Sequence, residues 1–214
     1  TIWGAGLSFA GASQTLGGDG EVVFGGTYPN SVLRAGLDAG QTLTIGAGIT
    51  VHGSTGGQGG TVDAASALIN EGTIAADAGQ TVTLAGSGLT NTGTIQANGG
   101  TVYLAGTYRT PQLGTLRNSG GVIYLSGALD NAGATLSLNA ATGVLSLASG
   151  TITGGTVSAE AGGGLAVAGS GVLSAVTLNT DLTVSDRSTL TVRDGPTLAD
   201  GHRVVLNSTI WGAG

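Results

Sequence analysis

Apolar and small polar residues alternate along short segments of this chain, as in Thr42–Ile45, Thr135–Leu138 and Thr189–Val192. An alternation with a period of two predicts β-strands that direct one face to a core. Gly, Asn, Ser and Asp interrupt the alternation every few positions and predict turns between the strands. Because no segment has the pattern of a helix of useful length, we expect an all-β protein.

The strand segments recur at a nearly constant distance and form two ladders of apolar residues. Both ladders advance in nearly equal steps of about 20 residues, a period typical of stacked repeats. A repeat of this size that holds only short strands cannot form a core alone, so it must stack on its neighbours. The first ladder consists of Ile74, Ile95, Leu116, Leu136 and Val157, and the second of Phe24, Ile45, Ala64, Leu84, Leu104, Leu125, Leu147 and Val167.

Stacked repeats predict a single-stranded parallel β-helix, or β-solenoid, of about ten coils, each of about 20–21 residues. Each strand would lie about 4.8 Å from its copy in the next coil. Residues 1–214 would then form one continuous β-helix segment. The region 181–203 departs from the pattern because charged residues, which are rare elsewhere, are concentrated in it. We expect it to be an irregular charged insertion or turn region.

The pattern Asn-x-Gly recurs and predicts a corner of the coil. The four asparagines concerned are Asn70, Asn91, Asn118 and Asn131. Asn favours turns because it tolerates the left-handed conformation and forms Asx-turns. Two interpretations stay open: the side chains stack into an Asn ladder, or Asn is a tolerated turn former. The stretch from Asn91 to Asn118 is longer than that from Asn70 to Asn91, and we expect the excess in the loop Thr107–Gln112.

One hexapeptide, Thr-Ile-Trp-Gly-Ala-Gly, occurs twice, at residues 1–6 and 209–214. It contains both tryptophans, Trp3 and Trp211, and the distance between its copies is close to ten coils. The repetition predicts that the two tryptophans mark a junction between units of a tandem array, of which this chain is slightly more than one unit, although two unrelated turns can share a sequence. The expected partner is therefore the protein itself, head-to-tail and also side by side.

The composition excludes several classes of function. Charged residues make up 8% of the chain, against about 25% in an ordinary domain. The net charge is −6, and the sequence has no Lys and no Cys. These values argue against a binder of nucleic acid or anionic membranes, and against disulfides or thiolate metal sites. No apolar run approaches about 18 residues, so we expect no membrane insertion.

Candidate chemistry is sparse. The acidic residues are mostly isolated, and His52 is expected to face solvent alone. Asp181, Asp186 and His202 form the only region rich enough for an active site, although a solvated turn explains them equally simply. We therefore expect no enzyme, no catalytic residue, no metal and no cofactor, with a polysaccharide-active enzyme as a remote alternative. Thr-x-Thr units do not recur on consecutive coils, which argues against ice binding.

The segments Ala67–Ile74 and Gly88–Ile95 share the pattern Leu-x-Asn-x-Gly-Thr-Ile. In this pattern the chain resembles the filamentous haemagglutinin and autotransporter-passenger class of bacterial surface proteins, over about residues 65–160. The resemblance implies a right-handed coil, export across bacterial membranes, and a stalk or an adhesin. We expect an extracellular structural fibre segment at the bacterial cell surface. The alternative is an adhesin that binds a glycan or host protein through the loop around Tyr108 or through 181–203.

Overall fold

The computed structural model describes residues 4–28, 31–35 and 40–209, and its described part is built almost wholly of parallel β-strands. The strands stack as a β-solenoid of about eight turns, which confirms the predicted fold class. The chain divides into two compact units, Thr1–Ile123 (unit 1) and Tyr124–Gly214 (unit 2).

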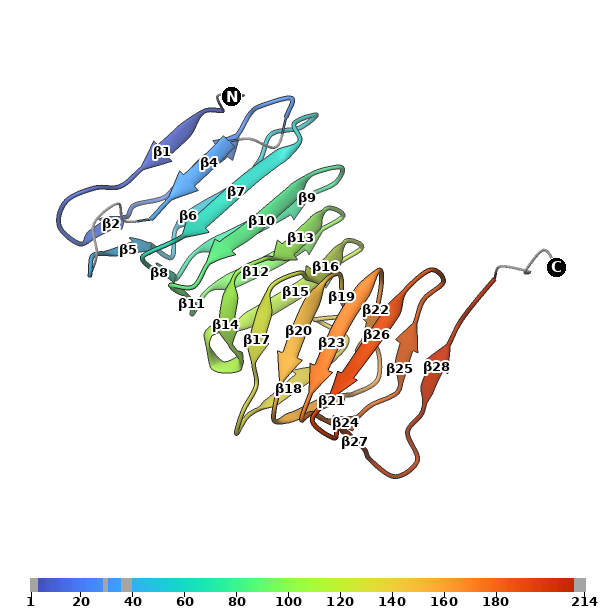
Figure 1. The fold of residues 1–214 in the computed structure, drawn as a ribbon. Coiled ribbons are helices and arrows are strands. Elements are labelled where there is room, and N and C mark those ends of the chain that lie inside the picture. The colour runs from blue at the N-terminus through green and yellow to red at the C-terminus, as the bar shows by residue number, and fades with distance from the viewer. Residues whose placement is uncertain (1–3, 29–30, 36–39, 210–214) are drawn as a thin grey trace. The chain divides into compact units, whose positions relative to one another are not determined.

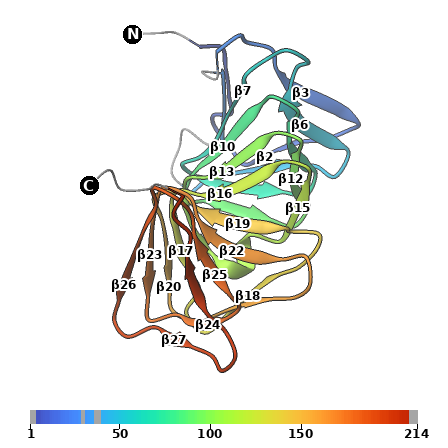
Figure 2. The same cartoon turned by 90° about the vertical axis from the view of Figure 1, so that its right-hand side faces the viewer.

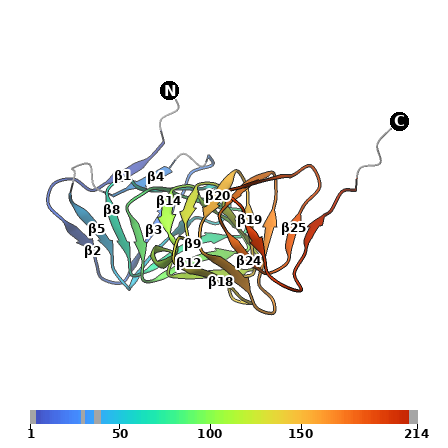
Figure 3. The ribbon, with the colours of Figure 1, turned by 60° about the horizontal axis from the view of Figure 1, so that its bottom comes forward.

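Unit 1 has three faces, which the chain visits in the same order in its first four turns (Figures 1 and 3). Face 1A consists of β1 (Gly6–Ser8), β4 (Ser31–Arg34), β7 (Gly59–Ala64), β10 (Thr81–Gly86) and β13 (Thr101–Leu104). Face 1B consists of β2 (Gln14–Leu16), β5 (Thr42–Ile45), β8 (Ala67–Asn70) and β11 (Leu89–Asn91). Face 1C consists of β3 (Gly20–Phe24), β6 (Ile49–Gly53), β9 (Thr73–Asp77), β12 (Thr94–Asn98) and β15 (Thr115–Ser119). The short strand β14 (Thr107–Arg109) and the 3-10 helix η1 (Thr110–Gln112) follow β13.

Unit 2 is also a three-faced stack, and Figure 2 shows the strands of its second face side by side. Face 2A consists of β19 (Val144–Leu147), β22 (Gly164–Val167), β25 (Leu182–Val184) and β28 (Val204–Leu206). Face 2B consists of β17 (Ala128–Asp130), β20 (Gly150–Thr153), β23 (Ser170–Ser174) and β26 (Thr189–Arg193). Face 2C consists of β18 (Thr135–Leu138), β21 (Thr156–Ala159), β24 (Thr177–Asn179) and β27 (Thr197–Leu198). The strand β16 (Val122–Leu125) contains the boundary between the units.

The turns differ in length more than the sequence ladders predict. On face 1A, Gly6 pairs with Val32 and Val32 pairs with Thr61, whereas Val82 pairs with Val102. The first two turns are thus longer than the period of about 20 residues that the ladders predict, and the later turn matches it. Long early turns use up part of the chain, and about eight turns form rather than the ten predicted.

Strand register corrects part of the second ladder. Leu84 pairs with Leu104 on face 1A, and Leu147 pairs with Val167 on face 2A. The early members lie elsewhere: Phe24 is on face 1C opposite Gly53, and Ile45 is on face 1B opposite Asn70. Ala64 is on face 1A, but it is opposite Gly86 rather than Leu84. The apolar column of face 1A in fact consists of Leu7, Leu33, Val62, Leu84 and Leu104.

The first ladder follows the register within each unit. Ile74, Ile95 and Leu116 form one column on face 1C, and Leu136 and Val157 form another on face 2C. All members of both ladders are buried, Leu125 in β16 included. Burial holds even for the misplaced members because every strand alternates inward and outward positions. The error in the predicted turn length therefore affects which residue lies opposite a core residue, but not whether that core residue is buried.

The region 181–203 is not an insertion. It contains β25, β26 and β27, and each of these strands pairs in parallel with a strand of the preceding turn of unit 2. Its charged residues occupy the outer positions and bends of a regular turn. Thr107–Gln112 likewise adds no excess residues, because the step from Thr94 to its partner Thr115 equals the step from Thr73 to Thr94.

Candidate functional site

Three groups of polar side chains bond one turn of unit 1 to the next. The most deeply buried group contains two of the predicted corner asparagines, Asn70 and Asn91, which pair in register at the ends of β8 and β11. Asn70 is 0% exposed and Asn91 is 2% exposed. A buried amide costs free energy unless its hydrogen bonds are made, so its partners decide its role.

The two amides form a ladder that runs along the stack. The Nδ2 of Asn70 donates to the Oδ1 of Asn91 at 2.7 Å. The Nδ2 of Asn91 then donates to the carbonyl of Leu113 in the following turn, at 2.8 Å, and more weakly to that of Thr115. Each asparagine therefore satisfies groups of the turn that follows it. The two buried side chains therefore connect successive turns by hydrogen bonds that water does not reach.

Asn131 makes the same kind of contact in unit 2. Its Nδ2 donates to the carbonyls of Gly154 and Thr156, at 3.2 and 2.9 Å, and its side chain is fully buried. Asn118 does not belong to this group. It lies in β15 opposite Ala97, and its Oδ1 accepts from the N–H of Gly121.

The backbone at these corners differs from the predicted left-handed turn. In the described part of the chain, the non-glycine residues with positive φ are Ser149, Ala175, Arg187 and Asp194, and no asparagine is among them. The glycines of Asn-x-Gly have two roles: Gly120 and Gly133 have positive φ with no close neighbour, whereas Gly72 and Gly93 lie against the backbone of the preceding turn. A Cβ on Gly93 would overlap the backbone of Glu71 and Gly72 in the turn before it. The glycine therefore allows two turns to approach closely.

The second group is a row of polar residues on the outer surface of face 1C, which the sequence pattern did not indicate. The Nε2 of His52 lies 3.5 Å from Glu21 Oε2, and its Nδ1 lies 3.1 Å from Asp77 Oδ2. Asn98 donates to the other oxygen of Asp77 at 2.8 Å. The row crosses β3, β6, β9 and β12, so His52 is half-buried between two carboxylates instead of facing solvent alone.

The geometry of this row favours a structural role over a catalytic one. A general base needs a free nitrogen within reach of the proton that it removes. The Nδ1 of His52 is instead hydrogen-bonded to Asp77, and its Nε2, which makes no hydrogen bond, is buried beside Glu21 of the neighbouring turn. Among the residues that the structure describes, no group of three His, Cys, Asp or Glu side chains is arranged to hold a metal ion.

The third group is the side chain of Tyr108 in β14, whose ring is buried and whose hydroxyl bonds to the preceding turn. Its ring is 1% exposed, and its hydroxyl donates to the carbonyl of Leu84 at 2.7 Å while accepting from the N–H of Gly106. Burial raises the pKa of Tyr108 to about 12. Because the ring is enclosed, it offers no platform to an external ligand.

In unit 2 the charged residues of 181–203 also contact the adjacent turn. Asp181 accepts from the backbone N–H of Arg203 and from its Nε, both at 3.1 Å, and lies 3.3 Å from Nδ1 of His202. The Arg203 backbone N–H, with help from both side chains, lowers the pKa of Asp181 despite the desolvation that opposes it. Asp186 is not beside them: it contacts Ser208 and Thr209. The predicted trio is therefore split into two separate contacts.

Face 2C carries rows of hydroxyl side chains in register, which the sequence pattern also did not indicate. The first row, on four consecutive turns, consists of Thr135, Thr156, Thr177 and Thr197. The second row, beside it, consists of Ser137, Ser158 and Asn179. These rows are made of single hydroxyl or amide side chains. The Thr-x-Thr units themselves lie on different faces or on non-adjacent turns, as the sequence predicted.

Trp3 and Trp211 lie outside the described residues. No helix in the described part of the chain is long and apolar enough to cross a membrane. The chain matches no family model, no curated protein and no solved structure. The class that the structure itself defines is a parallel β-solenoid with polar ties between its turns.

Proposed function

We propose that this protein is a structural segment of an extracellular fibre or stalk at a bacterial surface, with further copies of itself as its partner. The observation that carries the proposal is the buried Asn70–Asn91 ladder. It bonds three successive turns through groups that water does not reach, so it resists separation of the turns. The likeness of residues 65–160 to haemagglutinin and autotransporter passengers supports the location.

The remaining polar contacts support the same role. Arg34 and Asp63 form an ion pair at 3.0 Å between β4 and β7, and His52 joins β6 to β3 and β9. Such contacts lie on the solvated surface, where an ion pair contributes at most about 1 kcal/mol. They contribute together rather than singly, because each of them links one turn to the next along the stack.

Mechanical unfolding of the full chain tests the proposal. A stack in which each turn bonds only to its neighbours should unravel turn by turn. A turn of about 20 residues releases about 70 Å of chain when it extends, at about 3.5 Å per residue. We expect a series of force peaks with spacings near this length, and weaker peaks in Asn91→Ala. Featureless extension at low force would overturn a mechanical role.

The rows of face 2C favour a second candidate, an adhesin that binds a glycan. Their hydroxyl and amide groups face outward and repeat about every 4.8 Å along the stack. A glycan array probed with the full chain tests this candidate. Binding that Thr156→Ala with Ser158→Ala abolishes would support it, whereas binding that is unchanged in this variant would place the ligand elsewhere.

A further inference from the structure

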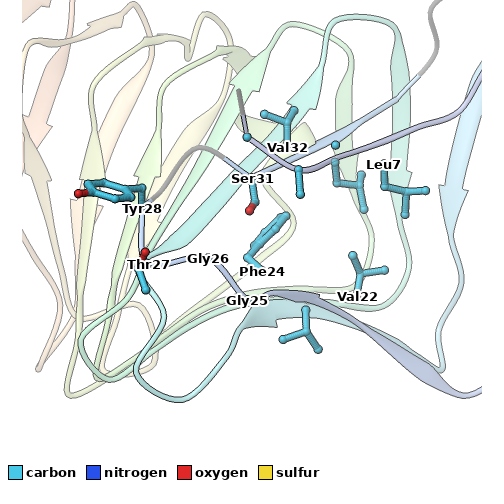
Figure 4. Close-up of a pocket in the computed structure, with 14 residues that line it drawn as sticks. Leu7, Val22, Phe24, Gly25, Gly26, Thr27, Tyr28, Ser31 and Val32 are labelled. Carbon is cyan, nitrogen blue, oxygen red and sulfur yellow. The ribbon is translucent and has the colours of Figure 1, made fainter. Parts of the chain in front are cut away.

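Unit 1 has a cavity of about 560 Å³ beside its first strand. The cavity lies between β1, β3 and β4, and Figure 4 shows Phe24, Val22 and Leu7 around it. Leu7 is 43% exposed, although its register partner Leu33 is fully buried. The cavity is thus the apolar interior of the stack, open to solvent at the β1 edge.

Residues 4–6 border this cavity and are joined to β4 through their backbone. Val32 donates its N–H to the carbonyl of Ala5 at 2.9 Å, and Gly6 pairs with Val32. The strand β1 is only three residues long and is exposed throughout. Short exposed edge strands are the segments that open most readily and that offer a template for another strand.

The hexapeptide that contains residues 4–6 occurs again at residues 209–214. Residues 212–214 have the same sequence as residues 4–6 and so can form the same backbone hydrogen bonds, which means that exchanging one for the other changes little free energy. Exchange of identical elements between protomers is the basis of domain swapping. We propose that residues 212–214 of one copy occupy the place of residues 4–6 in a second copy, with Gly214 opposite the second copy's Val32.

The chain between β28 and the second copy of the hexapeptide gives the exchanged segment its reach. Six residues, 207–212, separate β28 from Ala213, which would take the place of Ala5. They span up to about 20 Å when extended, or about four strand spacings.

A direct covalent continuation of the coil fits less well. In such a continuation, Gly214 would have to pair with a residue of β28 (Val204–Leu206), as Gly6 pairs with Val32. On face 2A even the shortest turn, from Leu165 to its partner Leu182, is longer than the stretch from Val204 to Gly214. The second copy of the hexapeptide therefore arrives too early for another turn on this face.

This contact rests on the proposed head-to-tail assembly and supplies its structural basis. It assigns the edge of β4 beside the cavity a partner of defined sequence, and it predicts a polar chain of copies, each donating one segment and accepting another. Heterologous contacts of this kind form open chains or closed rings, depending on the angle between copies.

Because the sequence has no cysteine, a disulfide trap gives a clean test. The full chain carrying Val32→Cys and Gly214→Cys should form reducible dimers and longer ladders under mild oxidation. A Cβ at Gly6, the position that Gly214 would take, meets its nearest neighbour at 3.8 Å, so the substituted side chain fits there. We expect at least tenfold more cross-linked product than from Val32→Cys alone or from Val32→Cys with Asp200→Cys.

Two further measurements make the result decisive. Gly6→Cys with Val32→Cys should close an internal disulfide and shows that the geometry permits the bond. If that control closes while the Val32/Gly214 pair stays monomeric, or closes only within one chain, the inference is wrong. Electron microscopy distinguishes this contact from the proposed fibre. Filaments that form without the cross-link would support the fibre and refute this contact. Cross-linked dimers that form no filaments would support this contact and refute the fibre.

Discussion

Replacing Asn91 with alanine tests whether the buried amide ladder stabilises unit 1. The side chain is 2% exposed and makes two short hydrogen bonds, one from Asn70 at 2.7 Å and one to the carbonyl of Leu113 at 2.8 Å. Asn91→Ala removes both. The Nδ2 of Asn70 keeps longer contacts to the carbonyls of Gly72 and Thr94, at 3.3 Å each, so it is only partly deprived of partners.

The expected loss follows from these contacts. A hydrogen bond contributes about 1 kcal/mol net, and a buried polar group left without its partner costs about 1–3 kcal/mol. Two short bonds and one longer bond, to the carbonyl of Thr115, are lost, and the carbonyl of Leu113 loses its amide partner. We therefore expect the free energy of unfolding to fall by about 2–4 kcal/mol.

Asn98→Ala is the matched control because it also removes an inter-turn amide bond in unit 1. Asn98 donates to Asp77 at 2.8 Å but is exposed, so water replaces the lost partner. Its cost should be below about 1 kcal/mol. Urea unfolding of both variants, followed by circular dichroism, measures the difference. Equal losses in the two variants, or a loss for Asn91→Ala within the about 0.5 kcal/mol typical of surface substitutions, would refute a special role for the buried ladder.

Three other perturbations have defined outcomes. Leu104→Ala should lower the free energy of unfolding by about 2–5 kcal/mol, because this fully buried side chain stacks on Leu84, and urea titration checks it. The pKa of Tyr108, raised to about 12, means that the unfolded state loses its proton first, so stability should fall by about 2–3 kcal/mol between pH 10 and pH 12. Tyr108→Phe should lack this alkaline slope, and a slope that persists in the variant would assign it to other groups. The lowered pKa of Asp181 implies a stabilising contribution that is present above the ordinary carboxyl pKa and lost as pH falls through the lowered value. Asp181→Asn should therefore be less stable than the parent at pH 7, with the difference shrinking under acid, as thermal unfolding at both pH values would show.

The core ladders show which pairs of residues the sequence period predicts correctly. Ile74 and Ile95, and Leu84 and Leu104, are separated by about 20 residues and do pair across adjacent turns. Phe24 lies outside their columns because the turn that follows it is longer and brings it opposite Gly53. The strand pattern does not constrain the number of residues between strands, so it does not predict this longer turn.

The polar contacts between turns were mostly not predictable from the sequence period. The steps from Glu21 to His52 and from His52 to Asp77 both exceed the period of about 20 residues, so a search at that period finds no relation among them. They meet because turns of unequal length place β3, β6 and β9 side by side. The pairing of Asn70 with Asn91 is predictable from the sequence because their turn has the regular length.

The sequence alone determined that this protein is a parallel β-solenoid. Alternation along each strand and repetition at a short period are local properties, and together they require inward apolar columns that only stacking can bury. The tertiary structure decided which residues face one another across turns. That choice depends on the length of every bend, which differs from turn to turn, and on the close packing of one backbone against the next. For this reason only the structure identifies three features: the columns formed by the early residues, the His52 row and the hydroxyl rows of face 2C.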